Sequence, residues 1–377
     1  MSKSRILVLE NSIAITGALK SIASVSRELQ SSFSFTFILP KKSEGRVLLD
    51  QLNVKDVLEW RMIEIRRSLF SLIFYLPTLV RNAMLLKKTV EARKIDLIHV
   101  NDIYNLLPPF ARLMGCKTPY VCHVRFMPKN FPTALFNFWF KVHGRYAKKI
   151  IVVSRAVYNE LPLHEKVEIV YDGFYFEHKK PHSIERKESD PFIFLYVANM
   201  IEGKGQNFAI RAFQKVHNQL AGWKLRFVGG NMGLSKNQKY LEALKQLARS
   251  LEVDDKIEWV GFTDDVEKEY KHADVALNFS SSESFSMTSL EALANECPLI
   301  VTDCGGPAEI VENGVTGLLV ENGNVDEMAS AMIKLASSQE LRKKMAAQGF
   351  EFALRTFNVK NTSARVKQIY ETCMKSE

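Results

Sequence analysis

The sequence has few cysteines, and none has the spacing of a metal site. Only five occur among 377 residues, at positions 116, 122, 297, 304 and 373, with no CxxC pair. This pattern excludes a zinc ribbon or a disulfide-stapled scaffold. We interpret the five as reduced, mostly buried thiols of an intracellular protein.

Long hydrophobic runs are also missing. The longest apolar stretch, residues 69–80, contains Ser71 and Thr78 and is interrupted by Pro77. Spanning a bilayer takes about 20 apolar residues, so this stretch is too short. The first residues, MSKSRILVLEN, have too short an apolar run for a signal peptide and read as a strand. We expect a cytoplasmic protein.

Two stretches combine apolar or aromatic residues with basic ones. Residues 61–88 place arginines and lysines on either side of the apolar run, and residues 132–149 place four aromatic side chains just before four basic ones. Such stretches can lie in a membrane interface. A buried helix with solvated ends would have the same apolar density, so both interpretations stay open.

Positive charge is concentrated in the first half of the chain. Residues 1–180 carry 28 Lys+Arg and 15 Asp+Glu, or +13, whereas residues 181–377 carry 23 and 27, or −4. The first half is therefore expected to meet an anionic partner, either nucleic acid or a membrane surface. The aromatic residues are not accompanied by an RNA-binding signature, which favours the membrane.

Strands and helices alternate along the whole chain. Short buried strands are predicted at residues 5–9, 33–39, 96–100, 118–123, 150–154 and 168–171, and a second series begins at residue 192. The run 178–190 is polar and poor in apolar residues, as expected of a linker. This pattern predicts an α/β protein with two doubly wound halves.

The stretch 274–323 is the most informative. DVALNFS and CPLIVTD read as buried strands, with the helix SMTSLEALANE between them, so they form a β-α-β unit. Glu283 lies in the loop before this helix, and Glu291 lies about a turn inside it. Ligands of open α/β sheets bind at such loops, and free N–H groups near Met287 and Thr288 suit a phosphate.

A simpler interpretation exists for both glutamates. Thr288-x-x-Glu291 also fits a capping box, and Glu283 could be a solvated loop acid. The residues that follow favour the ligand-binding interpretation.

The pattern ESFSMTSLEALANECPLIVTDCGGPAEIVENGVTGLLV, residues 283–320, resembles the signature of retaining family-4 glycosyltransferases. That resemblance implies a GT-B fold, in which two Rossmann-like domains face a central cleft. It implies an N-terminal acceptor domain at residues 1–178, a linker at 179–190 and a nucleotide-sugar domain at 191–356. Residues 357–377 would form a helix that crosses back to the first domain.

The resemblance also assigns roles to residues. Glu283 would contact the donor sugar, Glu291 the ribose, and Lys204 the donor diphosphate. His123, at a strand end, would lie near the reacting carbon, and Arg125 could pair with a phosphate or carboxylate of the acceptor. The remaining donor-binding residues would be Gly17, Asn199, Gly229, Phe262, Phe285, Ser286, Met287 and Thr288.

The chain departs from the family pattern at four places. Ser284 and Ser286 replace glycines, Ala198-Asn199 replaces Gly-Arg, Thr16-Gly17 replaces Gly-Gly, and Asp172 replaces an asparagine. One of the two cations expected beside the diphosphate is therefore missing.

The expected activity is sugar transfer from a nucleotide-diphosphate sugar to a saccharide, with catalysis by His123, Glu283 and Lys204. The acceptor would be lipid-linked, in cell-surface polysaccharide synthesis such as lipopolysaccharide or capsule, and the protein would lie on the inner face of the membrane. No metal or cofactor is expected. A catalytically degenerate binding subunit, a basic nucleic-acid binder and a GT-B epimerase are the alternatives.

Overall fold

The computed structural model describes residues 3–62, 69–176, 190–219 and 222–375, with side chains from residue 74 onward in the second range. The chain divides into two compact units. Unit 1 comprises Met1–Gly173 and Val359–Glu377, and unit 2 comprises Phe174–Asn358. The division thus falls at residue 173 rather than 178, and at 358 rather than 356. Residues 179–189 of the predicted linker lie outside the described residues.

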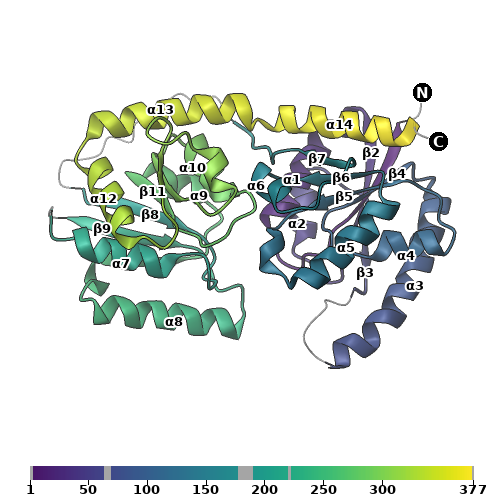
Figure 1. Ribbon diagram of the computed structural model, residues 1–377, viewed down its shortest axis with the longest axis horizontal. Coiled ribbons are helices and arrows are strands. Elements are labelled where there is room, and N and C mark those ends of the chain that lie inside the picture. Colours follow the sequence, from purple (N-terminus) through teal and green to yellow (C-terminus); the bar gives the residue numbers. More distant parts are fainter. Residues whose placement is uncertain (1–2, 63–68, 177–189, 220–221, 376–377) are drawn as a thin grey trace. The chain divides into compact units, whose positions relative to one another are not determined.

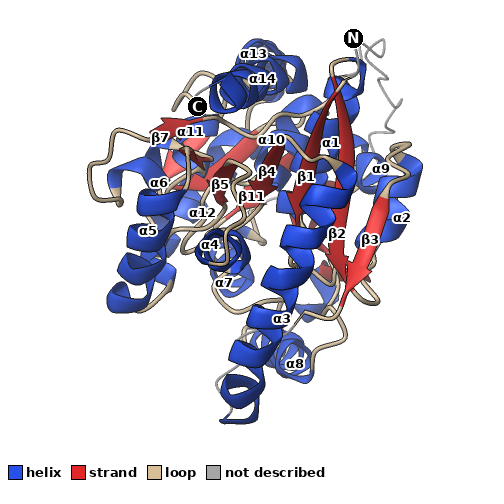
Figure 2. Ribbon diagram, turned by 90° about the vertical axis from the view of Figure 1, so that its right-hand side faces the viewer, coloured by secondary structure: helices blue, strands red, loops and turns tan. Residues whose placement is uncertain are grey.

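Unit 1 is built on a seven-stranded sheet in which the strands pair in parallel, in the order β3-β2-β1-β4-β5-β6-β7. Figure 2 shows β1, β2 and β3 side by side. The strands are β1 (Ser4–Leu9), β2 (Phe33–Pro40), β3 (Val57–Trp60), β4 (Leu97–Val100), β5 (Tyr120–Val124), β6 (Lys149–Val152) and β7 (Val167–Ile169).

The helices of unit 1 form two groups. The first group, which packs together, is α1 (Gly17–Glu28), α2 (Gly45–Gln51) and α14 (Val359–Lys375). The second group is α3 (Leu69–Arg93), α4 (Leu107–Leu113) and α5 (Thr133–Tyr146), and the short α6 (Arg155–Asn159) follows β6. Because Val366, Ile369 and Tyr370 of α14 join the core of this sheet, the last helix belongs to unit 1.

Unit 2 has a six-stranded parallel sheet in the order β10-β9-β8-β11-β12-β13. Its strands are β8 (Phe192–Val197), β9 (Trp223–Val228), β10 (Ile257–Gly261), β11 (Val275–Asn278), β12 (Leu299–Thr302) and β13 (Leu318–Val320). Its helices are α7 (Gln206–Val216), α8 (Ser235–Ser250), α9 (Val266–Lys271), α10 (Met287–Ala294), α11 (Pro307–Ile310), α12 (Val325–Ala336) and α13 (Gln339–Thr356). Figure 1 shows α7 and α8 on one side of this sheet and α10 and α13 on the other.

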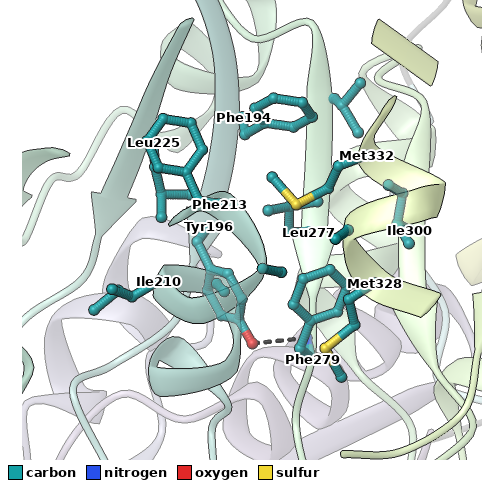
Figure 3. Packing of buried hydrophobic residues seen from close by; sticks show 14 of the residues in the cluster. Phe194, Tyr196, Ile210, Phe213, Leu225, Leu277, Phe279, Ile300, Met328 and Met332 are labelled. Carbon is teal, nitrogen blue, oxygen red and sulfur yellow. Dashed lines mark hydrogen bonds between the residues drawn. The ribbon is translucent and has the colours of Figure 1, made fainter. Parts of the chain in front are cut away.

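The core of unit 2 lies between the sheet and helices α7 and α12. Phe194 and Leu277 from the strands meet Phe213 of α7 and Met332 of α12, and all four are buried (Figure 3). The apolar strands read from the sequence are therefore confirmed as strands covered on their faces by helices.

One strand of unit 1 has no counterpart among the strands predicted from the sequence. Strand β3 (Val57–Trp60) pairs only with β2 and lies at the edge of the sheet. It has four residues, and only Trp60 is buried. So short a half-exposed strand has no clear apolar pattern, which explains why it went unrecognised.

All five cysteines lie among the described residues and are buried, free thiols. This confirms the interpretation of them as small core residues.

Candidate functional site

The order of the strands in unit 2 reverses between β8 and β11. These two strands are neighbours in the sheet, and the strands that follow them in sequence, β9 and β12, lie on opposite sides. Such a point opens a crevice at the carboxyl ends of the strands, where α/β proteins bind ligands. The loop after β8 carries Lys204, and the loop after β11 carries Glu283.

Lys204 and Glu283 meet at this point. Lys204 Nζ lies 2.5 Å from Glu283 Oε1, and the Ser280 hydroxyl donates a hydrogen bond of 3.0 Å to the same oxygen. The Lys204 side chain is 33% exposed and that of Glu283 is 15% exposed. A partly open ion pair at a switch point presents both charges to a ligand.

The backbone of Glu283 is also fixed. Its N–H donates to the carbonyl of Cys304 over 3.3 Å, and its carbonyl accepts from Gly306 N–H over 2.9 Å. A Cβ at Gly306 would lie 2.3 Å from the Cα of Phe285, so only glycine allows this approach. Glu283 is therefore not the solvated loop acid of the simpler interpretation.

Ser286 caps helix α10. Its hydroxyl oxygen accepts a hydrogen bond from Ser289 N–H at 3.3 Å and another from Asn278 Nδ2 at 2.8 Å. The alternative in which Thr288 caps the helix is therefore wrong, although the predicted helix start near residue 286 is confirmed. Ser286 has φ 92°, a backbone conformation that favours glycine.

Met287 and Thr288 form the first turn of α10, where N–H groups have no partner within the helix. Glu291 follows one turn later on the same helix. The structure therefore places these three predicted residues next to the loop that carries Glu283.

The other predicted donor residues of unit 2 have different surroundings. Asn199 follows β8, and its carbonyl accepts from Gln206 Nε2 at 2.9 Å. Gly229 follows β9 and has φ 143°, and a Cβ there would lie 2.0 Å from the carbonyl oxygen of Ala198. Phe262 follows β10 and is 74% exposed.

Phe285 is buried, and its ring packs edge-on against Phe357 with the centroids 5.6 Å apart. Its side chain thus belongs to the core of unit 2, which leaves its backbone as the part that could face a ligand.

His123 lies near the end of β5 in unit 1 and is buried. Neither of its ring nitrogens has a hydrogen-bond partner among the residues that the structure describes. Burial, with Arg125 and His99 as further causes, holds the pKa of His123 well below its usual value. The ring is therefore neutral at pH 7, and it can exchange hydrogen bonds but carries no charge.

Arg125 is not open to an acceptor. Its guanidinium forms a buried ion pair with Asp172, and its Nε donates to Asn101 Oδ1 at 3.1 Å. Asp172 also accepts from the Ser21 hydroxyl at 2.5 Å. Because Arg125 already has these internal partners, the arrangement does not support the predicted acceptor contact.

Gly17 is the first residue of α1, and Thr16 before it caps the helix by accepting from Leu19 N–H at 3.2 Å. Gly17 therefore opens helix α1, directly after the loop that follows β1, whereas the sequence placed it as the last residue of that loop. Its donor contact stays a prediction.

The residues that hold the two loops of unit 2 are not among those predicted from the sequence. Tyr196 on β8, Ser280 after β11 and Thr302 on β12 all hydrogen-bond to these loops. Tyr196 and Thr302 lie within apolar strand runs, so their hydroxyl groups are the only sequence signal that could have indicated a role in holding the loops.

Within the residues described, no helix is long and apolar enough to span a bilayer. The same part of the chain contains no cluster of three or more His, Cys, Asp or Glu side chains able to hold a metal ion.

Two family profiles match consecutive parts of the sequence. Glycosyltransferase Family 4 matches residues 16–176, and Glycosyl transferases group 1 matches residues 178–352. Together they account for nearly the whole chain, and they divide it close to the boundary between the two units.

Curated relatives are similar at the level of 25–30% identity. Putative glycosyltransferase EpsD of Bacillus subtilis is 26% identical over 83% of this chain and 84% of its own. N-acetyl-alpha-D-glucosaminyl L-malate synthase of Bacillus anthracis is 25% identical, and the match spans 60% of each chain. Lipopolysaccharide 1,6-galactosyltransferase of Escherichia coli is 29% identical over 41% of this chain and 42% of its own.

Solved structures share the fold. Anabaena HepE, crystallised with UDP and glucose, superposes with a TM-score of 0.81 at 19% identity, covering 97% of this chain and 99% of its own. Sucrose-phosphate synthase from Thermosynechococcus elongatus gives 0.80 at 16% identity and covers all of both chains. These likenesses confirm the predicted GT-B fold.

Proposed function

This chain belongs to the family-4 glycosyltransferases, and we propose that it transfers a sugar from a nucleotide-diphosphate sugar to a saccharide acceptor with retention of configuration. The observation that carries the proposal is the Lys204–Glu283 pair at the switch point of unit 2. A cation and a carboxylate side by side suit a diphosphate and the hydroxyls of a sugar.

The expected chemistry places the charge of Lys204 where it is needed. As the bond from the sugar to the diphosphate breaks, negative charge grows on the leaving oxygen. Lys204 and the first turn of α10, at Met287 and Thr288, would stabilise that charge. Glu283 would hold the sugar hydroxyls, Glu291 the ribose, and neutral His123 would hydrogen-bond beside the reacting carbon. We propose no protein nucleophile and no metal.

The nature of the donor is open to a direct test. Thermal unfolding would be followed with UDP, GDP, ADP and CMP, using wild type and Glu291→Ala. A nucleotide that binds only the folded chain raises the melting temperature, because binding stabilises the folded state. At a concentration 100 times its dissociation constant, the added free energy of unfolding is about 2.7 kcal/mol. We expect one nucleotide to stabilise wild type and not the variant.

If none stabilises wild type at millimolar concentration, the donor site is refuted. The chain would then be better explained as a degenerate binding subunit, which the replacements at Asn199 and Ser286 would favour. Retention would be checked separately, by the anomeric coupling constant of the product.

We further propose a lipid-linked acceptor at an anionic membrane surface. Helix α5 supports this: Leu135, Phe138, Lys141 and Arg145 are all exposed on it. Their spacing of three to four residues puts apolar and basic side chains on one stripe, as in helices that lie in a membrane interface.

The stripe on α5 can be tested with vesicles. Wild type should co-sediment with vesicles containing anionic lipid and be released by high salt. Phe138→Ser with Lys141→Glu should weaken this binding, whereas the control Lys236→Glu on α8 of unit 2 should not. Equal binding of both variants would refute the role of α5.

A further inference from the structure

Tyr196 contributes one hydroxyl to two loops at once. The residue lies on β8 and is buried. Its hydroxyl donates to the carbonyl of Lys204 at 2.5 Å and accepts from the N–H of Phe279 at 2.7 Å. Figure 3 shows the ring of Tyr196 within the core and its hydroxyl directed at Phe279. The hydroxyl therefore acts as a donor to one loop and as an acceptor from the other.

The two loops that Tyr196 joins carry the charged pair of the site. One contains Lys204, and the other runs from Phe279 to Glu283. They touch elsewhere as well: Ser281 N–H donates to the carbonyl of Gly203 at 2.9 Å, and a Cβ at Gly205 would lie 1.9 Å from the carbonyl oxygen of Phe279. The loops are therefore in backbone contact at these two points.

We propose that Tyr196 is a positioning residue, which sets the distance between the Lys204 ammonium and the Glu283 carboxylate. The proposal rests on the proposed function for the meaning of that distance. The ring of Tyr196 packs in the core, so the ring supplies stability. The hydroxyl fixes the register of one loop against the other.

Neutrality of the hydroxyl is part of this arrangement. Burial raises the pKa of Tyr196 well above its usual value, so the group keeps its proton. Without the hydroxyl, the buried N–H of Phe279 would lose its acceptor. The Lys204 carbonyl would keep only a long contact of 3.5 Å with the Ser280 hydroxyl. Both groups would then seek other partners, and the loops would shift.

The test compares Tyr196→Phe, Lys204→Ala and the double variant in a transfer assay. Tyr196→Phe keeps the ring and removes only the hydroxyl. We expect kcat to fall about 10- to 100-fold, with a much smaller change in the KM of the donor, because misplacement of a charge acts in the transition state. In the Lys204→Ala background, Tyr196→Phe should lower kcat by less than about threefold, because the Tyr196 hydroxyl acts through Lys204.

Tyr240→Phe is the matched control. The hydroxyl of Tyr240 lies in the same unit, 3.4 Å from Gln206 Oε1, and is hydrogen-bonded to the backbone of Asn207 on helix α7. This control should leave kcat unchanged. If Tyr196→Phe lowers kcat equally with and without Lys204, the positioning role is refuted.

Hydrogen exchange supplies a reading that does not depend on activity. Amides of residues 279–283 should exchange faster in Tyr196→Phe than in wild type, while amides in helices α7 and α12 keep their protection. Unchanged exchange at 279–283, or a rise spread over all of unit 2, would overturn the proposal. If wild type transfers no sugar, the proposed function fails, and exchange still decides whether Tyr196 holds the loops.

Discussion

The ammonium of Lys204 lies 2.5 Å from the carboxylate of Glu283, so two residues assigned to different parts of the donor bind each other. The diphosphate of a donor and the carboxylate of Glu283 must therefore compete for Lys204. Removing the charge of Glu283 has opposite consequences for binding and for transfer.

We predict that Glu283→Gln binds a nucleoside diphosphate more tightly than wild type, by roughly fivefold, which is about the 1 kcal/mol that a partly exposed ion pair contributes. Sugar transfer should nevertheless fall, because the amide holds sugar hydroxyls less well than a carboxylate. Calorimetric titration gives the first quantity and a transfer assay the second. Weaker diphosphate binding by Glu283→Gln would show that the diphosphate and the Glu283 carboxylate do not compete for Lys204.

Gly203 and Gly205 give a matched pair of substitutions in the Lys204 loop. Both have positive φ, 92° and 78°, so alanine strains the backbone at either position. Gly203 has open space around its missing Cβ, whereas Gly205 faces the carbonyl of Phe279. Gly203→Ala should cost about 1 kcal/mol of unfolding free energy, and Gly205→Ala clearly more, because strain and a backbone clash add. Equal melting temperatures would mean that the loops do not touch.

Ser286 combines a strained backbone with a good cap. Alanine removes the cap and keeps the strain, while glycine removes both. We therefore expect Ser286→Ala to lose about 1–2 kcal/mol and Ser286→Gly to lose less, despite its greater flexibility. Urea unfolding of the two variants measures the difference. A more stable alanine variant would contradict the backbone conformation at residue 286.

Buried histidines make unit 1 sensitive to acid. Burial, followed by the nearby Arg125, lowers the pKa of His99 to about 3, and the His99 Nδ1 lies 2.7 Å from the Tyr370 hydroxyl. The unfolded chain binds a proton at His99 below about pH 6.5 and the folded chain does not, so stability is present above that pH and falls as pH decreases.

This residue alone should contribute a slope of about 1.4 kcal/mol per pH unit between roughly pH 6 and 4. His99→Gln, which titrates no proton, should reduce the slope of unfolding free energy against pH by that amount. The control Asn322→Gln, at an exposed amide that carries no titratable group, should leave the slope unchanged. An unchanged slope in His99→Gln would mean that His99 titrates normally in the folded chain.

Much of the fold could be predicted because apolar strands covered on both faces leave a strong signal, and β11, α10 and β12 follow the sequence closely. Glu283 could be found because its loop follows such a strand, and Lys204 because its loop resembles the family pattern. The partners of Arg125 could not, since Asp172 is 47 positions away in the chain and nothing local indicates a buried pair. The role of Tyr196 could not be predicted for the same reason. Its hydroxyl bonds to loops that lie further along the chain, while its ring fits the pattern of an apolar core residue.

The most direct test of the donor site compares a nucleoside diphosphate with the matching monophosphate by calorimetry. The base is the one that stabilises the chain in thermal unfolding, and the proteins are wild type, Lys204→Ala and the control Lys236→Ala. Wild type and the control should prefer the diphosphate by about tenfold or more, an amount typical of one charge-assisted contact, and Lys204→Ala should lose that preference. If Lys204→Ala keeps it, Lys204 does not bind the diphosphate and the account of this site is wrong.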